Sequence, residues 1–111
     1  MFRQVYLCEG IGNLYWMPGY VIWKWSEADV FVSLIRDESA LFCHFAASGE
    51  GVRRLKQAIN EFCCKVFDDF PWCFAVMACI TLESVVRLVR KCNFSHVIDH
   101  DYLKVYARYR T

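Results

Sequence analysis

The chain has 111 residues, enough for a single domain with one hydrophobic core over residues 1–111. Its residues are 57% hydrophobic and 23% charged, so it has the apolar side chains that a core needs and is not a disordered chain. The formal net charge of +1 gives no general attraction to nucleic acid or to an anionic membrane, and the longest uncharged stretches, residues 10–23 and 70–82, are shorter than the roughly 20 residues of a membrane-spanning helix.

The first half of the chain predicts strands. Aromatic and β-branched side chains, which favour strands, are concentrated in four segments: residues 2–8, 20–25, 28–35 and 40–46. Residues 17–19 and 36–39 have the composition of turns. The second turn joins the last two strands, so these are expected to form an antiparallel hairpin.

The second half opens with a predicted helix. From Val52 onward, apolar residues recur at positions 52, 55, 58, 59, 62, 63, 66 and 67, the spacing of a helix with one buried face. Pro71 ends this pattern, because the residue before a proline avoids the helical conformation. We therefore expect the helix to stop within residues 68–71.

A strand, a second helix and two strands are predicted to follow. Residues 72–79 are a continuous apolar run, which is typical of a strand covered on both faces. Thr81 is expected to cap a helix whose buried side comprises Leu82, Val85, Val86, Val89 and Cys92. Residues 97–98 and 103–109 are expected to be strands. The order predicts an α/β fold with a mixed, mostly antiparallel sheet flanked by helices.

Cysteine is frequent in this chain, at Cys8, Cys43, Cys63, Cys64, Cys73, Cys79 and Cys92. The number is odd, several lie inside apolar runs, and no Cys-x-x-Cys pair occurs. His96 and His100 are four residues apart, but their segment has the pattern of a strand and a turn. We expect reduced cysteines used as small core residues, no metal site, no signal peptide and a cytoplasmic location.

A Gly-x-Gly sequence lies where the strand at residues 40–46 gives way to the first helix. Gly49 and Gly51 allow a tight turn, and the free amides at a helix start attract anions such as phosphate. Arg53 and Arg54 add positive charge there. The alternative is that the glycines only complete a plain turn.

Two segments, residues 46–55 and 82–94, resemble conserved parts of the Gcn5-related N-acetyltransferase (GNAT) superfamily, and the likeness covers roughly residues 28–110. The first looks like the loop that holds the pyrophosphate of acyl-CoA by its backbone amides, and the second like a helix followed by Gly-Phe and two strands. The resemblance implies a GNAT-like fold with a shortened N-terminal region, and acetyl-CoA as the cofactor. It places the cofactor-binding residues at Phe45, Ala46, Ser48, Gly49, Glu50, Gly51, Val52, Arg53 and Arg54.

Five positions depart from the family pattern, one of them Leu82, which stands where the family has an asparagine near the helix start. Ala46 stands where the family has Gln or Arg, and Glu50 puts a carboxylate in the loop, where it competes with a phosphate or merely favours the helix start. The tyrosine that many relatives use to protonate the departing thiolate falls at Val89, which has no proton to give. Asn93 replaces the glycine before Phe94.

His44 is the candidate general base, because relatives often keep one on this strand and the ordinary pKa of histidine is near 6.5. Side chains alternate along a strand, so only one of Cys43 and His44 can face the cleft. The alternative places His44 on the solvent side and Cys43 in the core.

Two functions follow as hypotheses. The first is an acyl-CoA-dependent N-acetyltransferase that transfers an acetyl group to an amine or protein acceptor. The second is a catalytically degenerate, GNAT-like bacteriophage protein that works in the host cytoplasm by binding a host or virion protein. The aromatic-rich opening of the chain also predicts a homodimer or a partner contact, or simply a covered sheet.

Overall fold

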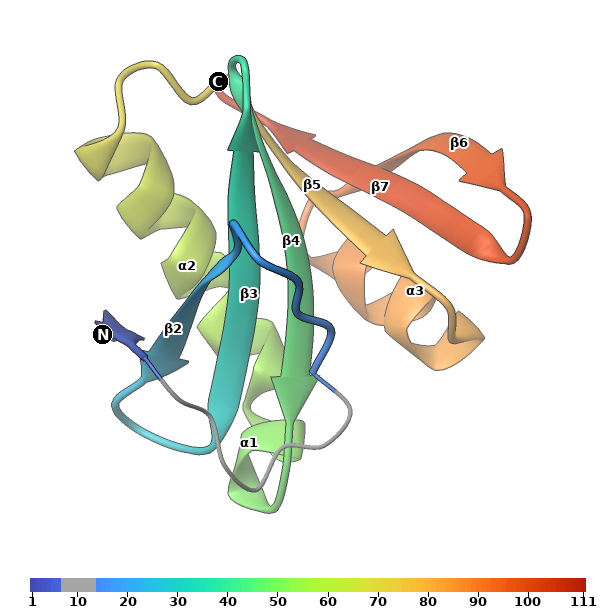
Figure 1. The fold of residues 1–111 in the computed structure, drawn as a ribbon. Helices are drawn as coiled ribbons and strands as arrows, with labels where there is room; N and C mark the ends of the chain where they lie inside the picture. The colour runs from blue at the N-terminus through green and yellow to red at the C-terminus, as the bar shows by residue number, and fades with distance from the viewer. Residues whose placement is uncertain (7–13) are drawn as a thin grey trace.

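The computed structural model describes residues 1–6 and 14–111, which form one mixed sheet with helices (Figure 1). The strands are β1 (Phe2–Val5), β2 (Val21–Trp25), β3 (Val30–Asp37), β4 (Ala40–Ala47), β5 (Ala75–Ile80), β6 (Ser95–His100) and β7 (Leu103–Tyr109). The helices are α1 (Glu50–Arg53), α2 (Leu55–Asp69) and α3 (Glu83–Lys91). The strand order is β1-β2-β3-β4-β5-β7-β6. The predicted α/β class with a mostly antiparallel sheet is confirmed.

One parallel pairing joins the two halves of the described sheet. Strands β4 and β5 pair from Ala40 with Ala75 to Cys43 with Ala78. Beyond these four pairs both strands continue but no longer pair, and Figure 1 shows them spreading apart. The other five strand pairings are antiparallel.

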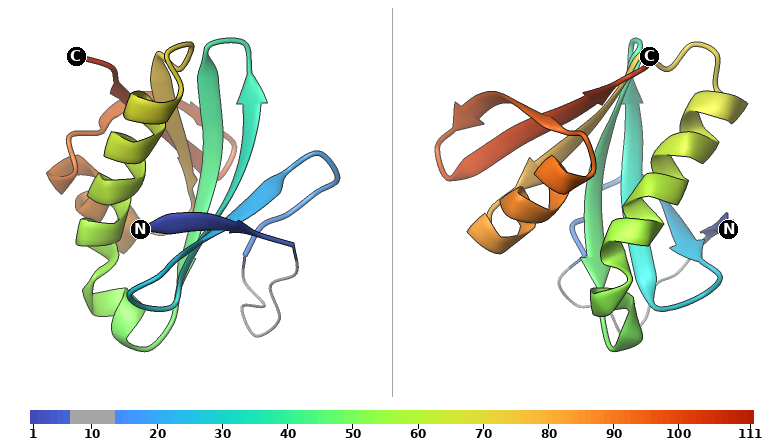
Figure 2. Two further views of the ribbon diagram at one scale, coloured as in Figure 1. Left: turned by 90° about the vertical axis from the view of Figure 1, so that its left-hand side faces the viewer. Right: turned by 180° about the vertical axis from the view of Figure 1, so that it is seen from behind.

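The helices lie on one face of the sheet, as the rear view in Figure 2 shows. Alternate residues of the central strands point toward them and form the core, including Val32, Cys43 and Val76. The apolar stripe of α2 supplies Ile59 and Phe62 to the same cluster. The amphipathic helix predicted from this stripe is therefore present as α2, and its end at Asp69 agrees with the prediction.

The opposite face has no helix among the described residues and a smaller cluster. Ile22, Phe31 and Ala46 are buried there. Ser33 on β3 is fully buried on this sheet, and its hydroxyl donates a hydrogen bond to the carbonyl oxygen of Tyr15. The bond holds the segment before β2 across the sheet.

Three expected strands differ in extent. The first strand ends at Val5, and the remainder of its predicted span falls within residues 7–13, outside the described part of the chain. The strand expected at 28–35 runs from Val30 to Asp37. The last two strands pair as a hairpin, with β6 covering Ser95–His100 rather than residues 97–98. Interstrand pairing to β7 extends β6 beyond its apolar residues.

The helix after β4 starts earlier than expected and is interrupted. A short helix covers Glu50–Arg53, and α2 begins at Leu55. Arg54 between them has φ −101° and ψ 10°, outside helical geometry. The pattern of apolar residues did not indicate this break, because it counted Val52 as the first residue of the buried face. In the structure Val52 is exposed.

Three expectations about the second half are wrong, one of which is that Leu82 belongs to the buried side of the helix, since it is 62% exposed. The run at 72–79 is not a strand covered on both faces, since β5 begins at Ala75 and Phe74 is 55% exposed. The helix-free side of β5 leaves Met77 and Cys79 only partly buried. Thr81 does not cap α3, whose N-cap residue is Leu82 and makes no side-chain cap bond.

Candidate functional site

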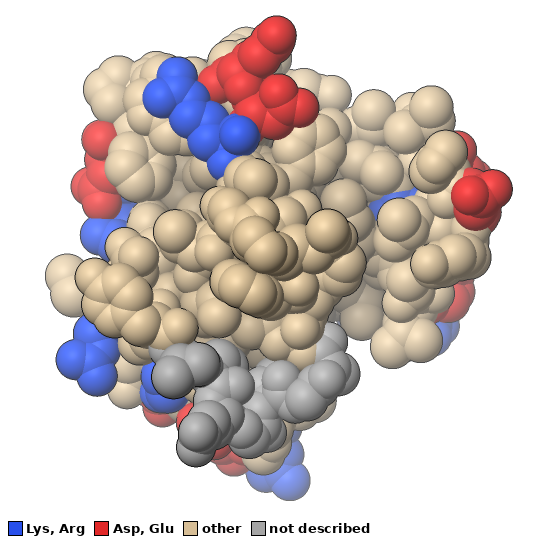
Figure 3. Space-filling view, in the orientation of Figure 1, with Lys and Arg blue, Asp and Glu red and all other residues tan. Residues whose placement is uncertain are grey.

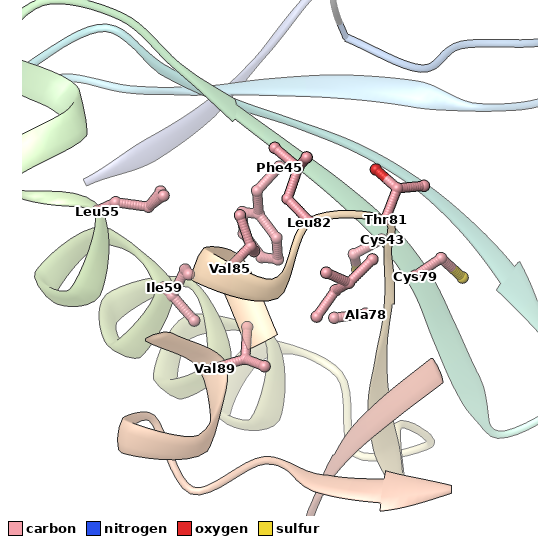
Figure 4. A pocket seen from close by; sticks show the side chains of 11 residues that line it. Cys43, Phe45, Leu55, Ile59, Ala78, Cys79, Thr81, Leu82, Val85 and Val89 are labelled. Carbon is pink, nitrogen blue, oxygen red and sulfur yellow. The ribbon is translucent and has the colours of Figure 1, made fainter. Parts of the chain in front are cut away.

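An apolar pocket of about 290 Å³ occupies the space where β4 and β5 part (Figure 4). Strands β4 and β5 supply two of its walls, and α2 and α3 supply the others. Its lining is Cys43, Phe45, Leu55, Ile59, Ala78, Cys79, Ile80, Thr81, Leu82, Val85 and Val89. The volume is close to the lower end of the range for small-molecule sites. The pocket is thus suited to an apolar or amphipathic chain.

The two sides of β4 separate Cys43 from His44. Cys43 is buried on the helix side, and burial raises the pKa of its thiol well above the ordinary value, so it stays protonated. His44 lies on the helix-free side and is partly buried. Cys43 therefore lies in the core, as one of the two arrangements predicts, but His44 on the other side is not freely exposed to solvent.

His44 is covered by aromatic rings. Its ring centroid lies 4.3 Å from that of Tyr15 and 6.1 Å from that of Tyr20. Burial lowers the pKa of His44 below its ordinary 6.5, so the imidazole is neutral at neutral pH and can accept a proton.

A second pocket of about 490 Å³ opens on this helix-free face. Its lining is Tyr15, Tyr20, His44, Phe45, Cys79, Thr81, Tyr102 and Leu103. Phe45, Cys79 and Thr81 line the first pocket as well. The parting of β4 and β5 is therefore bordered by a pocket on each face of the sheet.

The predicted phosphate loop is a tightly closed turn. The amide of Ser48 donates to the carbonyl oxygen of Asp29 at 3.0 Å, that of Gly51 to Ser48 at 3.0 Å, and that of Val52 to Gly49 at 3.2 Å. Three amides of the turn thus already have backbone partners.

The two glycines of the turn have different structural roles. Gly49 adopts φ +57°, a conformation that favours glycine. A Cβ added to Gly51 would lie 2.4 Å from the carbonyl oxygen of Asp29. Gly51 is therefore required for close packing against the start of β3.

Both arginines of the turn are paired with glutamates. The guanidinium of Arg53 lies 3.7 Å from the carboxylate of Glu50, and Arg53 is strongly exposed. Arg54 donates to Glu27 at 2.9 Å and lies over the ring of Trp25 at 4.7 Å. The positive charge expected at the turn is thus offset by carboxylates.

The structure divides the residues predicted to bind the cofactor. Phe45 lines both pockets, whereas Ala46 is buried in the small cluster on the opposite face. The turn holds the remaining ones together: Ser48, Gly49, Glu50, Gly51, Val52, Arg53 and Arg54. Val89 lines the first pocket.

Several lining residues were not singled out as site residues from the sequence, namely Tyr15, Tyr20, Cys79 and Tyr102. Strand alternation places Cys79 with Met77 on the helix-free side. The residues that surround Cys79 there depend on which distant strands pair, and the sequence pattern does not show this. The aromatic richness of the chain start was the available signal for Tyr15 and Tyr20.

The cysteines differ in their surroundings. Cys43, Cys63, Cys73 and Cys92 are buried and free, as expected for core residues, while Cys64 is exposed. Cys8 lies outside the described residues. Within residues 1–6 and 14–111, no three His, Cys, Asp or Glu side chains gather in a way that would hold a metal ion. In the same part of the chain, none of the helices has the length and apolar character to cross a membrane.

No family model, curated protein or solved structure matches this chain.

Proposed function

We propose that this protein binds an acyl thioester of the acetyl-CoA type between β4 and β5 and transfers its acyl group to an amine, as a GNAT-like N-acyltransferase. The observation that supports this most directly is the parallel pair β4–β5, which stops pairing after Cys43 and Ala78 and borders an apolar pocket. Unpaired strand edges offer backbone groups to the amides of a pantetheine arm, and apolar walls suit its alkyl chain.

The order of elements along the chain supports the proposal. The hairpin of β3 and β4 is followed by the glycine turn and a helix, then by β5, α3 and the hairpin of β6 and β7, which is the order on which the family resemblance rests.

The cofactor fits the pocket better than it fits the turn. The lining of the pocket contains no Asp, Glu, Lys or Arg among the described residues, which suits a neutral acyl-pantetheine end. At the turn, Glu50 repels a pyrophosphate and its pairing with Arg53 must be broken to free the guanidinium. We therefore assign most of the binding to the pocket rather than to the turn.

The chain's own groups can perform the proton transfers. A bound thioester supplies an electrophilic carbonyl carbon, which the amine attacks while the carbon–sulfur bond breaks and the sulfur takes the electron pair. The neutral imidazole of His44 can accept the proton that the amine loses. Burial, with nearby Tyr15 and Cys79, raises the pKa of Tyr20, so its hydroxyl remains protonated and can donate to the sulfur, the role that the tyrosine missing at position 89 has in many relatives.

Thermal unfolding with acetyl-CoA tests the proposal. A ligand at 100 times its dissociation constant stabilises the folded state by about 2.7 kcal/mol, which raises Tm by about 10 °C for a domain of this size. Val85→Phe, which fills the pocket from α3, is expected to abolish the rise.

Val97→Phe is the matched control, since Val97 is 42% exposed on β6 and does not line the pocket. It is expected to keep the full shift. An unchanged Tm of the unmodified protein at millimolar acetyl-CoA overturns the acyltransferase proposal.

A second function is favoured by the turn. The pairing of Arg53 with Glu50, and the buried Val89 in the pocket, fit a GNAT-like scaffold that has lost catalysis and works by binding a host or virion protein. Exposed aromatic residues near the start, Tyr6 at 88% and Trp16 at 51%, provide a contact surface for such a partner or for a homodimer. Sedimentation velocity distinguishes a dimer, which Tyr6→Ser with Trp16→Ser should dissociate, from a monomer.

A further inference from the structure

The two faces of the sheet differ in where their charged side chains lie. The middle of the helix-free face carries few of them (Figure 3). On the helix side, β7 directs an arginine toward the core: Tyr106 is buried in the main cluster, and Arg108, two residues further on, points the same way and bonds to α2. Arg108 is half-buried, so its guanidinium has lost part of its water and needs other partners.

Arg108 lines a third pocket, of about 340 Å³, at the end of the sheet away from the gap. At that end β7 pairs with the start of β5, Tyr109 with Ala75, whereas the gap opens beyond Ala78. The other lining residues are Phe67, Asn93, Tyr109 and Thr111. None of them lines either pocket at the gap. The third pocket is therefore separate from the proposed acyltransferase site.

The protein uses only part of the Arg108 guanidinium. Its Nη1 donates to the side-chain oxygen of Asn60 at 2.9 Å and to the carbonyl oxygen of Cys92 at 3.3 Å. Among the described residues, Nε and Nη2 have no oxygen acceptor, and no carboxylate lies within ion-pairing distance. In the same part of the chain no buried side-chain nitrogen lacks a hydrogen-bond partner, so Nε and Nη2 are accessible from outside the protein.

Arg110, which follows β7, has the opposite arrangement. Its Nε donates to the carbonyl oxygen of Cys73 at 2.8 Å, and its Nη2 donates to that of Phe70 at 2.7 Å. Its guanidinium also lies over the ring of Phe67, 5.1 Å from the centroid. The Nε–Nη2 edge therefore has two protein acceptors in Arg110 and none among the described residues in Arg108.

The groups around Arg108 leave its charge uncompensated. The thiol of Cys63 is close by, but burial raises its pKa to about 12 although the guanidinium lowers it, so the thiol is uncharged at neutral pH. Cys92 is the C-cap residue of α3, and its carbonyl oxygen contributes the partial negative charge of a helix end. The net positive charge at this place is therefore less than two and suits an anion with one charge.

A carboxylate matches the accessible edge of Arg108. Its two oxygens accept two parallel hydrogen bonds from Nε and Nη2, and its single charge balances that of the guanidinium. Arg108 has the only charged side chain in the described lining, and the rings of Phe67 and Tyr109 suit an aromatic body. We propose that the third pocket binds a small aromatic monocarboxylic acid, with its carboxylate on Arg108.

NMR of the arginine side chains tests the contact directly. In two-dimensional proton–nitrogen spectra at mildly acidic pH, phenylacetate, which is ionised there, should shift the Nε–H resonance of Arg108. The Nε–H of Arg110 already bonds to Cys73 and is the internal control, which should move much less. An unmoved Arg108 resonance at millimolar phenylacetate overturns the proposal.

Three related compounds test the class of ligand. Phenylacetamide has the same shape without the charge, and 2-phenylethylamine carries an ammonium group instead of the carboxylate. Both should bind at least about tenfold more weakly than phenylacetate, because they lose the paired, charge-assisted hydrogen bonds. Inorganic phosphate should also bind more weakly, since the lining offers no second cation. Binding of any of the three as tightly as phenylacetate overturns the assignment to a monocarboxylic acid.

Two variants locate the binding. Arg108→Lys keeps the positive charge but removes the planar edge, and saturation-transfer NMR should show phenylacetate binding weakened about tenfold. Arg87→Lys is the matched control, since Arg87 is exposed on α3 and does not line the pocket. Phe67→Leu leaves the bonds of Arg108 in place and should weaken binding about two- to threefold through loss of a ring.

The bonds of Arg108 to Asn60 and Cys92 also support the fold, so thermal unfolding of each variant is measured first. If Arg108→Lys does not fold, the Nε–H shift in the unmodified protein and the affinity of Phe67→Leu decide. Equal affinity in Arg108→Lys and Arg87→Lys contradicts the placement. The acetyl-CoA shift is independent of these results, because the two sites share no lining residue.

Discussion

The turn at Ser48–Arg54 and the gap between β4 and β5 both lie at the carboxyl-terminal end of β4, yet they differ in how their groups are bonded. In the turn, amides reach carbonyl oxygens and arginines reach glutamates. In the gap, two strands stop pairing and apolar side chains border open volume. The amides and arginines of the turn, which has the composition of a binding loop, are thus already paired within the protein. The strands β4 and β5, whose composition is ordinary, leave room for a ligand.

The largest expected effect separates the two glycines of the turn. Gly51→Ala should reduce the free energy of unfolding by about 3 kcal/mol, because the new Cβ meets the carbonyl oxygen of Asp29 at 2.4 Å and the backbone must shift. Gly49→Ala has open space around its Cβ and should cost about 1–2 kcal/mol through its positive φ. Chemical denaturation measures both, and a larger loss in Gly49→Ala would contradict the packing role of Gly51.

The two arginines should also differ. Arg54→Ala should cost about 1 kcal/mol, since it removes the bond to Glu27 and the contact with Trp25. Arg53→Ala should change stability by less than about 0.5 kcal/mol, because its side chain is exposed. Equal losses in urea unfolding would mean that Arg54 does not anchor the turn.

A smaller effect is expected from pH at the rim of the gap. Burial lowers the pKa of His44 in the folded protein below its ordinary 6.5, so below this pH the unfolded chain binds more protons. The free energy of unfolding therefore has its full value, as far as His44 is concerned, above pH 6.5. It decreases as the pH falls from 6.5 toward the lowered pKa. His44→Gln should remove that part of the decline, measured as urea midpoints across this range.

His100→Gln is the control for this titration. His100 has 79% of its side chain exposed, and its replacement should leave the decline unchanged. The same decline in His44→Gln as in the unmodified protein would show that His44 is not the group responsible.

The smallest effect concerns ligand affinity at the turn. Glu50→Gln removes a carboxylate and frees Arg53, so acetyl-CoA should bind about threefold more tightly, as isothermal titration would measure. Glu83→Gln changes an exposed charge paired with Lys104 on the other side of the gap and should have no such effect. Unchanged affinity in Glu50→Gln would place the turn away from the ligand.

Much of the fold could be predicted from local pattern. The hairpin of β3 and β4, the apolar stripe and the end of α2, and the alternating last strand all follow from side-chain periodicity. Thr81 was wrongly predicted as the helix cap, because the helix begins one residue later and Leu82 is its N-cap residue. Phe74 was wrongly predicted as a core residue, because helices cover only one face of the sheet.

The candidate site was less predictable. Gly51 packs against Asp29, which is more than twenty positions away in the sequence. The ring of Tyr15 lies against His44, and the carbonyl oxygen of Tyr15 accepts a hydrogen bond from Ser33. Such contacts depend on which strands become neighbours, and no periodicity within a single segment encodes them. The gap itself arises from the parallel pairing of β4 with β5, which is decided by the whole topology.

The four pairs between β4 and β5 have a consequence for dynamics. In the described sheet they form the one ladder between a half built on β1–β4 and a half built on β5–β7. A ligand bound beyond Cys43 and Ala78 contacts both halves of the sheet and therefore stabilises the pairing between them. Amide hydrogen exchange in the four pairs between β4 and β5 should then slow on ligand binding. The exchange rate would therefore report binding even of a ligand that the protein does not convert.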